Sequence, residues 1–230
     1  MRRVTERAAV PGDLRRRLWI GICGAAAFMT SACADGARRP DFDPWHQSIS
    51  ALSLGPDGWL QIANFMMFGA AVLTTVPAWR RILWGGIGGG AVPVLTAMTG
   101  VSLILAGLLP QDPAPGYDPM ALRLTEPTLP GLLHLLVAAV AAGSSIAVLA
   151  VMSKRFGGDP KWPGWSAYSL LMSVAMTVCV AVYAVWSTAA SGYAGAFERA
   201  ALMVTPIWGA TFLRQLATGR PFMVARDRES

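Results

Sequence analysis

Charged residues are scarce in this chain. Asp, Glu, Lys and Arg together make up 14% of its 230 residues, while apolar residues make up 54%. A typical soluble domain carries about 25% charged residues, so this chain has too few charges to cover a water-facing surface. The shortage excludes an ordinary soluble globular protein, and the long apolar runs between the charges favour a protein that crosses a membrane several times.

Cysteine and histidine are scarcer still, which limits the metal and redox chemistry of the chain. Cys23, Cys33 and Cys179 form no CxxC pair, so we interpret them as small packing residues rather than as a disulfide or metal framework. His46 and His134, with several carboxylates, are enough ligands for zinc, yet no HExxH or similarly close spacing exists. We therefore predict no metal site, and the sequence leaves any cofactor unknown.

The net charge of +6 raises the question of nucleic-acid binding. A nucleic-acid surface needs basic residues that converge on one accessible face. Here the basic residues alternate with apolar stretches along the chain. We therefore expect membrane lipids as partners and no nucleic acid, and the sequence leaves a homo-oligomer open.

Six apolar segments predict an all-α fold, a bundle of six transmembrane helices. A spanning helix needs about 20 residues to cross a hydrocarbon core of about 30 Å. The segments cover residues 18–34, 59–79, 82–109, 130–152, 166–189 and 196–216. The third segment is long, and we expect it to tilt or to bend at Pro93. The predicted organisation is a basic cytoplasmic segment at 1–17, the six-helix domain at 18–217 and a cytoplasmic tail at 218–230.

The distribution of Lys and Arg predicts the orientation of these spans. With the N-terminus in the cytoplasm, 15 of the 19 basic residues lie on the inner side, and the remaining four lie outside. This imbalance favours a topology with both ends in the cytoplasm under the positive-inside rule. Trp59, Trp79, Trp84 and Trp165 lie near the ends of spans, where aromatic residues usually meet the membrane interface.

The N-terminal segment has a second interpretation. Arg15-Arg16-Arg17, an apolar run and Thr30-Ser-Ala-Cys33 are similar to a bacterial lipoprotein signal, in which Cys33 would be lipidated. Thr30 stands where such a signal expects Leu or Val, and five further apolar segments follow. We therefore favour a first helix that is retained.

The first outer loop, residues 35–58, is too long to be a simple connection, and long ordered loops tend to carry function. Asp43 suits an N-cap and Pro44 suits the first helical position. Gly55 followed by Pro56 would end the helix. We therefore predict a short interfacial helix over residues 44–54 on the outer side.

This interfacial helix would have two faces. Helical spacing places Trp45, Ile49 and Leu52 on one face, and His46 and Ser50 on the other. In the simpler interpretation the helix covers the bundle and His46 is merely polar. In the alternative interpretation the His46 face lies over a site.

Polar residues of three other segments reach the same outer depth. Asp112 directly follows the third span, His134 lies one turn into the fourth, and Glu198 and Arg199 open the sixth. Ionisable residues within membrane spans are rare and usually face a partner or a cavity. The candidate ligand-binding residues are Asp35, Asp43, His46, Ser50, Asp112, His134, Glu198 and Arg199.

We expect Asp112, His134 and the Glu198–Arg199 pair to form one connected polar cluster beneath the first outer loop. His134 is flanked by leucines, and it leaves the lipid most easily by turning inward. Asp112 and His134 would then lie within about 10 Å of each other, in reach of a hydrogen bond or one bridging water. Such a cluster is a structural polar network, a ligand or lipid head-group site, or a hydrolytic site with a metal or an acid/base pair.

Two further patterns indicate contacts between helices. The glycine run at residues 85–90 has GxxxG spacing, which in a membrane indicates close helix packing, and no GK[ST] follows it as in a phosphate loop. Ser166, Ser169, Ser173 and Thr177 recur at helical spacing. Such a stripe usually faces another helix.

These outer-side motifs carry a family resemblance. Asp43-Pro-Trp-His-Gln-Ser-Ile-Ser-Ala-Leu52, Leu109-Pro-Gln-Asp-Pro113, Leu133-His134 and Glu198-Arg199 resemble the bacterial membrane family called domain of unknown function 998. Leu109 departs from the pattern, because the family usually has an aromatic residue there. The resemblance implies six spans in a plasma membrane and supplies no activity. A more distant likeness to membrane proteins of the Frag1/DRAM/Sfk1 type rests on layout.

These patterns lead to one favoured function and two alternatives. We expect an integral protein of the bacterial plasma membrane that binds or handles a lipid or another amphiphile at the outer side. The first alternative is a membrane-embedded hydrolase that uses the outer Asp and His residues. The second is a structural or assembly partner. The sequence does not decide whether the protein is an enzyme.

Overall fold

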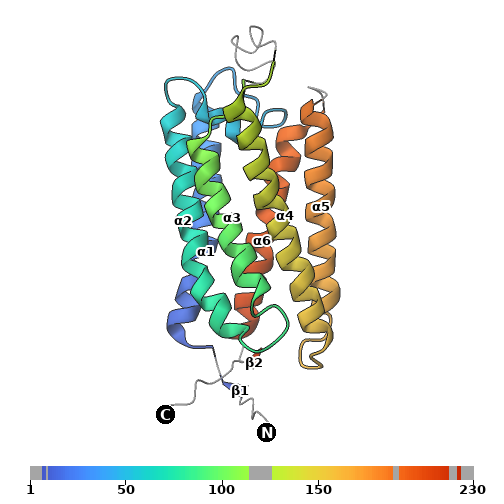
Figure 1. Ribbon diagram of the computed structural model, residues 1–230. Coiled ribbons are helices and arrows are strands. Elements are labelled where there is room, and N and C mark those ends of the chain that lie inside the picture. The colour runs from blue at the N-terminus through green and yellow to red at the C-terminus, as the bar shows by residue number, and fades with distance from the viewer. Residues whose placement is uncertain (1–6, 9, 114–125, 189–191, 218–221, 224–230) are drawn as a thin grey trace.

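The structure, a computed structural model, describes residues 7–8, 10–113, 126–188, 192–217 and 222–223. Within these residues the chain forms six α-helices, one short 3-10 helix and one pair of very short strands (Figure 1). In chain order they are β1 (Arg7–Ala8), α1 (Gly12–Arg38), η1 (Ile49–Ser53), α2 (Gly58–Ile82), α3 (Ala91–Leu108), α4 (Leu129–Gly157), α5 (Trp165–Thr188), α6 (Ala194–Ala217) and β2 (Phe222–Met223).

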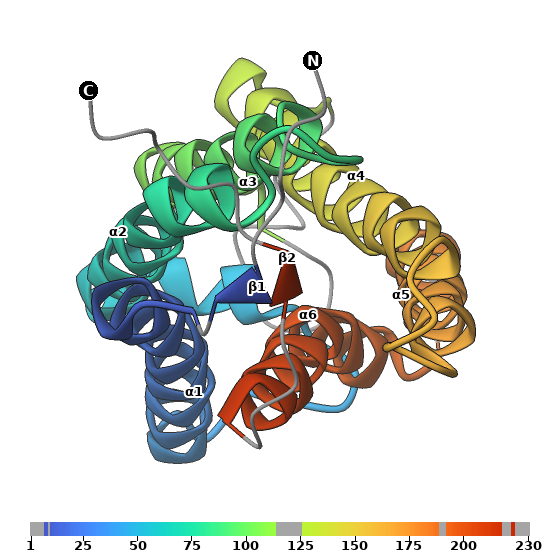
Figure 2. The same cartoon turned by 90° about the horizontal axis from the view of Figure 1, so that it is seen from below.

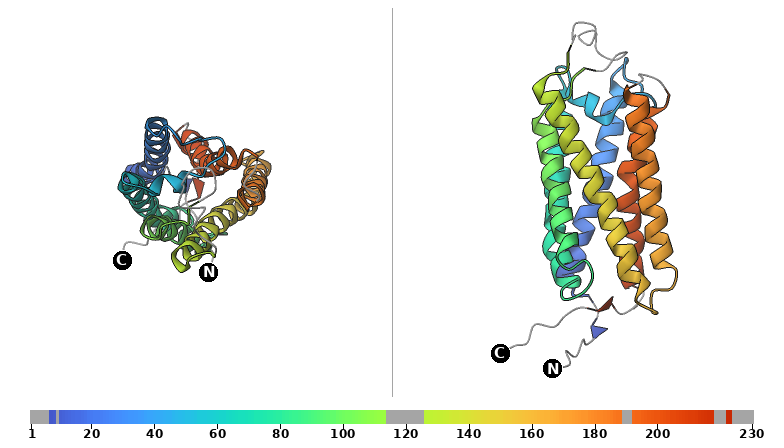
Figure 3. Two further views of the ribbon diagram at one scale, coloured as in Figure 1. Left: turned by 90° about the horizontal axis from the view of Figure 1, so that it is seen from above. Right: turned by 45° about the vertical axis from the view of Figure 1, so that its right-hand side comes forward.

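The six helices stand side by side as a ring rather than as a filled bundle. Each helix packs against the next one in sequence, and α6 packs back against α1 to close the ring. Figures 2 and 3 show this ring along its axis. We call the end that holds η1 the η1 end, and the end that holds the β1–β2 pair the terminal end.

The helices identify the chain as an integral membrane protein. The five helices α1 to α5 are long and apolar enough to cross a membrane. The 24-residue α6 is more polar, because it contains Glu198, Arg199 and Arg214. Large apolar side chains also point outward, with Met67 63% and Leu171 64% exposed. Water disfavours such a surface, whereas lipid does not.

Aromatic side chains fill the ring at the terminal end. Trp208 stacks on Phe212 with ring centroids 5.5 Å apart, and Trp162 lies edge-on to Trp165 at 5.1 Å. The indole N–H of Trp208 donates to the Ser169 hydroxyl at 2.9 Å, so this buried polar group is satisfied. The interior is therefore closed at this end by a packed aromatic cluster.

The cluster corrects part of the aromatic-belt prediction. Trp79 and Trp165 are only 8% and 7% exposed, and they pack inside the ring. Trp59 and Trp84 are 63% and 53% exposed, which suits residues at a membrane interface. Position near the end of a span does not distinguish the two pairs, because burial depends on whether the side chain points into the ring or out of it.

The third predicted span begins too early. Residues 83–90 form turns, in which Gly86 N–H donates to Leu83 O and Gly88 has a φ of 86° that favours glycine. Pro93 lies in the first turn of α3, where its missing N–H breaks no helical hydrogen bond. The predicted bend at Pro93 is therefore wrong, whereas the alternative of a tilt stays a prediction. The glycine run is not helical, so it forms no GxxxG helix contact, although a Cβ added to Gly86 or Gly88 would meet Arg155 or Val151 of α4.

The predicted interfacial helix over residues 44–54 is also corrected. Only Ile49–Ser53 is helical, as η1, and all five of its residues are buried. Ser48 is its N-cap, since the Ser48 hydroxyl accepts a hydrogen bond from Ala51 N–H at 3.2 Å. Trp45 is 62% exposed, whereas Ile49 and Leu52 are fully buried, so they do not share one face. The segment closes the η1 end from inside the ring.

The two ends of the described chain meet at the terminal end. Arg7 pairs with Met223 and Ala8 pairs with Phe222 in an antiparallel arrangement. The all-α prediction did not include this two-residue pairing. It also placed residues 1–17 outside the helices, whereas α1 already begins at Gly12.

Glycines bring two helices into close contact elsewhere. A Cβ added to Gly69 of α2 would lie 2.5 Å from the carbonyl oxygen of Gly100 in α3. A Cβ on Gly100 would lie 2.7 Å from the Leu73 side chain. The α2–α3 contact therefore depends on small residues, as membrane helix contacts commonly do.

We predict that Gly69→Ala lowers stability by about 1–3 kcal/mol, because the methyl group forces α2 and α3 apart. The measurement is the unfolding temperature of purified protein in detergent. Gly143→Ala in α4 is the matched control, since nothing lies within 4 Å of its added Cβ. Equal unfolding temperatures for the two variants would contradict the close α2–α3 contact.

Candidate functional site

The ring of helices encloses an elongated cavity of about 420 Å³. This volume lies within the usual range of small-molecule sites, about 300–1,000 Å³. Most of its wall is apolar, and Trp79, Trp208 and Phe212 line it toward the terminal end. Its polar residues toward the η1 end are Ser50, Gln111, His134, Tyr183 and Glu198. Thr and Ser residues, among them Thr96, Thr99 and Ser145, also line the cavity along its length. The wall is thus mostly apolar, with its amide and ionisable groups toward the η1 end.

The cavity opens sideways between α4 and α5. Figures 1 and 3 show these two helices diverging toward the η1 end. Their hydrogen-bonded contacts, such as Ser153 to the backbone of Ser166 and Ser173 to that of Ile146, lie in the terminal half. In the η1 half the cavity is lined by exposed residues of both helices, namely Leu135, Ala138, Ala139, Ala184, Ser187 and Thr188. Ser166 and Ser173 thus face α4 and Ser169 faces α6, as predicted, whereas Thr177 is exposed and bonds to Ser173 O of its own helix.

Glu198 joins the cavity wall to η1. It lies in the first turns of α6, and its Oε2 accepts a hydrogen bond from Ile49 N–H at 2.6 Å. This N–H belongs to the first residue of η1, so the carboxylate satisfies a donor that the short helix leaves free. Tyr183 of α5 lies close by and interacts with both Glu198 and Ser48. Two helices and the η1 segment thus meet at one carboxylate.

His134 is 3% exposed, and its ring forms hydrogen bonds with backbone carbonyl groups at the end of α3. Its Nδ1 lies 2.7 Å from the carbonyl oxygen of Leu109 and 3.1 Å from that of Ala106. Carbonyl oxygens only accept, so Nδ1 carries the proton. Within the described residues, Nε2 has no hydrogen-bond partner, and the ring lines the cavity.

Asp112 forms hydrogen bonds with Thr128, the N-cap residue of α4. Its carboxylate accepts from the backbone N–H of Thr128 at 2.9 Å and from the Thr128 hydroxyl at 2.5 Å. The Thr128 hydroxyl in turn accepts from Gly131 N–H at 3.1 Å, which caps the helix. In the described part of the chain, Asp112 and His134 therefore bond to different groups. The polar cluster that would connect them stays a prediction.

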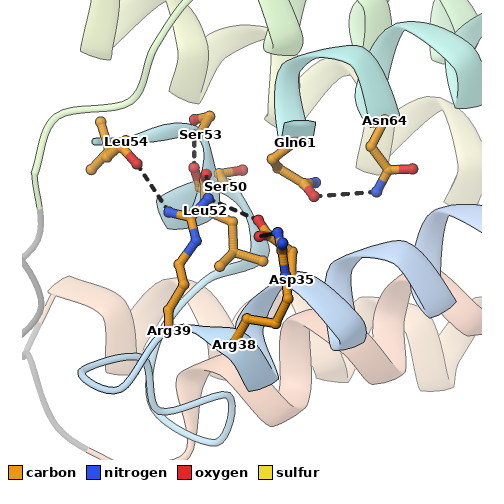
Figure 4. A network of polar contacts seen from close by, with 9 residues as sticks. All are labelled: Asp35, Arg38, Arg39, Ser50, Leu52, Ser53, Leu54, Gln61 and Asn64. Carbon is orange, nitrogen blue, oxygen red and sulfur yellow. Dashed lines mark hydrogen bonds and ion pairs between the residues drawn. The ribbon is translucent and has the colours of Figure 1, made fainter. Parts of the chain in front are cut away.

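Asp35 and Arg39 fasten η1 to α1, as Figure 4 shows. Asp35 is 6% exposed and pairs with Arg39 at 2.8 Å and with Arg38 at 2.7 Å. The Arg39 guanidinium also donates to the carbonyl oxygens of Leu52 and Leu54. The pair thus holds the irregular backbone beside η1, and neither residue lines the cavity.

Arg199 fastens the segment before η1 to α6. Its guanidinium donates to the carbonyl oxygens of Gln47 and Gly195, each at 2.9 Å. It also lies 5.6 Å from the ring centroid of Phe42, a cation–π distance. The Arg199 guanidinium is therefore bound to Gln47, Gly195 and Phe42, and Arg199 does not line the cavity.

Asp43 and His46 form an exposed pair away from the cavity. The backbone N–H of Trp45 and the ring of His46 contact the Asp43 carboxylate at 2.9 and 2.7 Å. These two hydrogen bonds lower the pKa of Asp43 below its ordinary value. The His46 ring also lies against Tyr193, with centroids 5.2 Å apart. This arrangement orders the turn before η1.

The structure therefore divides the eight candidate residues into two groups. Three of them line the cavity: Ser50, His134 and Glu198. The other five, Asp35, Asp43, His46, Asp112 and Arg199, fasten segments of the η1 end to one another. Among the described residues, no three side chains of His, Cys, Asp and Glu gather as metal ligands would.

Sequence reasoning missed several polar residues of the η1 end. Gln61 and Asn64 of α2 are 1% and 4% exposed, and Asn64 donates to Gln61 Oε1 and to the Phe28 carbonyl oxygen. Gln111 accepts from the Ser48 hydroxyl at 3.0 Å and lines the cavity. The signal for Gln61 and Asn64 was available, since two amides three residues apart in an apolar span usually bond across helices.

A family model described as "Protein of unknown function (DUF998)" matches residues 22–215. The chain belongs to the DUF998 family. No curated protein and no solved structure matches the chain.

The DUF998 match extends from α1 to α6 and includes η1. All polar residues at the η1 end of the cavity fall inside it, as do the buried Asp35–Arg39 pair and Arg199. The closure at the η1 end and the cavity lining other than Leu18 and Gly21 thus lie in the DUF998 part of the chain.

In this DUF998 protein we predict that Asp35→Asn lowers stability by about 3 kcal/mol. The change leaves the guanidinium of Arg39, whose side chain is 13% exposed, without its carboxylate. Asp43→Asn is the matched control, and it costs at most about 1 kcal/mol because its partner His46 is exposed. Thermal unfolding in detergent measures both variants. Similar losses for the two would show that the Asp35 pair does not hold η1.

Proposed function

We propose that the protein binds a membrane amphiphile in its central cavity, with the apolar chain between the helices and the head group at the η1 end. The observation that supports this most directly is the cavity itself. It is mostly apolar along its length, carries its amide and ionisable groups toward one end and is open to the side between α4 and α5. These are the features that an apolar chain with one polar end requires.

The side opening supports a lipid-like ligand over a water-soluble one. Residues beside the opening, such as Leu135 at 61% exposure and Val185 at 63%, form an apolar outer surface. In a membrane this surface faces acyl chains, so an amphiphile enters without leaving the bilayer. Each methylene buried in the cavity contributes about 0.8 kcal/mol relative to water and less relative to lipid. Polar contacts at the η1 end must therefore supply much of the selectivity.

We further propose six spans in the bacterial plasma membrane, with both ends of the chain in the cytoplasm. The Lys and Arg distribution supports this orientation, since the terminal end carries most of the basic residues. In this orientation the η1 end faces outward, and α6 crosses the membrane with Glu198 and Arg199 at its outer end. The head group then lies at the level of the outer leaflet.

A membrane hydrolase is a second candidate, because His134 and Glu198 line the same cavity. A general base needs to lie within hydrogen-bond reach of the group that it deprotonates. In the described residues Nε2 of His134 is free to act as a base, but neither His134 nor Glu198 is hydrogen-bonded to the other or to a hydroxyl that could serve as the nucleophile. Amphiphile binding is therefore the function that the geometry supports best.

Reporter fusions test the orientation. Alkaline phosphatase is active only outside the cytoplasm, so we expect activity when it is fused in the segment between α3 and α4. We expect no activity after Gly158, between α4 and α5, or at the C-terminus. An active C-terminal fusion would overturn the six-span topology.

Filling the cavity tests the binding. Ala142 lines the cavity, so Ala142→Phe should remove the space of two or three methylenes and weaken binding by roughly tenfold or more. Native mass spectrometry of detergent-purified protein measures the fraction that carries a bound amphiphile. Ala181→Phe is the matched control, because Ala181 of α5 is exposed and does not line the cavity.

The same measurement separates the alternatives. A wild-type protein without bound amphiphile, or equal occupancy of the two variants, would refute cavity binding. Recovery of a cleaved amphiphile would favour the hydrolase. A purely structural role predicts that Ala142→Phe changes only the unfolding temperature.

A further inference from the structure

The cavity wall, as far as the structure describes it, carries an acidic side chain but no basic Lys or Arg side chain to balance it. Among the described residues that line the cavity, Glu198 is the one acidic residue, and Lys and Arg are absent. The other polar groups toward the η1 end include Ser50, Gln111, His134, Tyr183, Ser187 and Thr188. Any head group in the cavity therefore meets one carboxyl group and no permanent cation.

The described basic residues of the η1 end, Arg38, Arg39 and Arg199, are held elsewhere. Arg199 donates to the carbonyl oxygens of Gln47 and Gly195 and lies against Phe42. Arg38 and Arg39 pair with the Asp35 carboxylate. None of these guanidinium groups lines the cavity, so none is placed to neutralise an anion there.

The ionisable groups of the wall offer acceptors to a ligand, whereas the Gln111 amide, whose Oε1 accepts from Ser48, keeps its N–H groups as donors. The Nδ1–H of His134 is used by two carbonyl oxygens, so Nε2 of the neutral ring offers a lone pair. Glu198 uses Oε2 for Ile49 N–H, and its carboxylate has further acceptor sites. Ser50 and Tyr183 have hydroxyls that can donate or accept. The two ionisable groups thus both offer acceptors.

We infer that the cavity selects an amphiphile whose head group donates hydrogen bonds and carries no negative charge, an alcohol or an amine. This inference rests on the proposed function and specifies its ligand class. Glu198 is then the specificity-determining residue. A phosphate or carboxylate head group would lie beside it with no cation between them. Like charges repel strongly in a site with little water.

Three probes of equal chain length test this selectivity. Each is a dodecyl chain with a bromine at its end, carrying an alcohol, an ammonium or a phosphate head group. Bromine quenches tryptophan fluorescence on contact, and Trp79 and Trp208 line the apolar half of the cavity. Quenching of the full-length protein in nanodiscs, minus that of Ala142→Phe, isolates binding in the cavity from partition into the bilayer.

We expect cavity-specific quenching by the alcohol or the ammonium at concentrations at least about tenfold lower than by the phosphate. The tighter of the two identifies the head group. Glu198→Gln keeps an acceptor for Ile49 N–H but removes the charge. This variant should bind the ammonium probe about tenfold more weakly and the alcohol probe with an affinity within about twofold of wild type. It should bind the phosphate probe more tightly than wild type does. A role of Glu198 in stability alone would move all three probes together.

The outcomes distinguish failure of this inference from failure of the proposed function. If no probe quenches beyond the Ala142→Phe baseline, the proposed function fails. If the phosphate quenches as well as the other probes in wild-type protein, the cavity binds amphiphiles and the head-group inference is overturned. This second comparison uses wild-type protein, so it holds even where Glu198→Gln does not fold.

Discussion

The backbone between α1 and α2 must satisfy its hydrogen bonds without regular structure, and much of the η1 end follows from this constraint. The η1 part of this segment is buried inside the ring, where an unpaired N–H or C=O is costly. Charged side chains supply the missing partners. Arg39 donates to the carbonyl oxygens of Leu52 and Leu54, Glu198 accepts from Ile49, and Arg199 donates to Gln47. The charges in an otherwise apolar protein thus fasten a closing segment in place.

The cavity exists because its two ends are built differently. At the terminal end, Trp208, Phe212 and neighbouring aromatic rings fill the interior by stacking. At the η1 end, a short helix held by polar contacts covers the ring without filling it. Between them α4 and α5 separate toward the η1 end, so the enclosed space reaches the lipid-facing surface. A fully packed bundle would have neither the volume nor the side opening.

Most ionisable residues of the η1 end have a structural task that explains their presence. Asp112 supports the cap of α4, Asp35 orients Arg39, and Asp43 orders a turn. Glu198 and His134 also have structural bonds, but they additionally line the cavity and retain free acceptor capacity. Placing an ionisable group beside a cavity within a membrane costs free energy. A role in ligand binding therefore explains Glu198 and His134 better than it explains the other charged residues.

The sequence by itself determined the membrane character and the approximate position of the helices. Both depend on local properties, namely apolar runs of about 20 residues and the charges between them. The same local signals failed where burial decides the outcome. Proline and cap residues predicted a helix over residues 44–54, yet only Ile49–Ser53 is helical, because the segment must fit inside the ring. The glycine run at 85–90 became a turn, while Gly69 and Gly100 formed the close helix contact.

Only the tertiary structure decided which polar residues line the cavity. The position of each residue along its predicted span placed Asp112, His134 and Glu198 at one depth in the membrane, since the rise per residue of a helix is fixed. It could not show that Asp112 turns to Thr128, or that His134 bonds to the end of α3. Those partners come from other segments, and the direction of a side chain around its helix depends on how all six helices pack. The cavity is a property of the ring, which no single segment encodes.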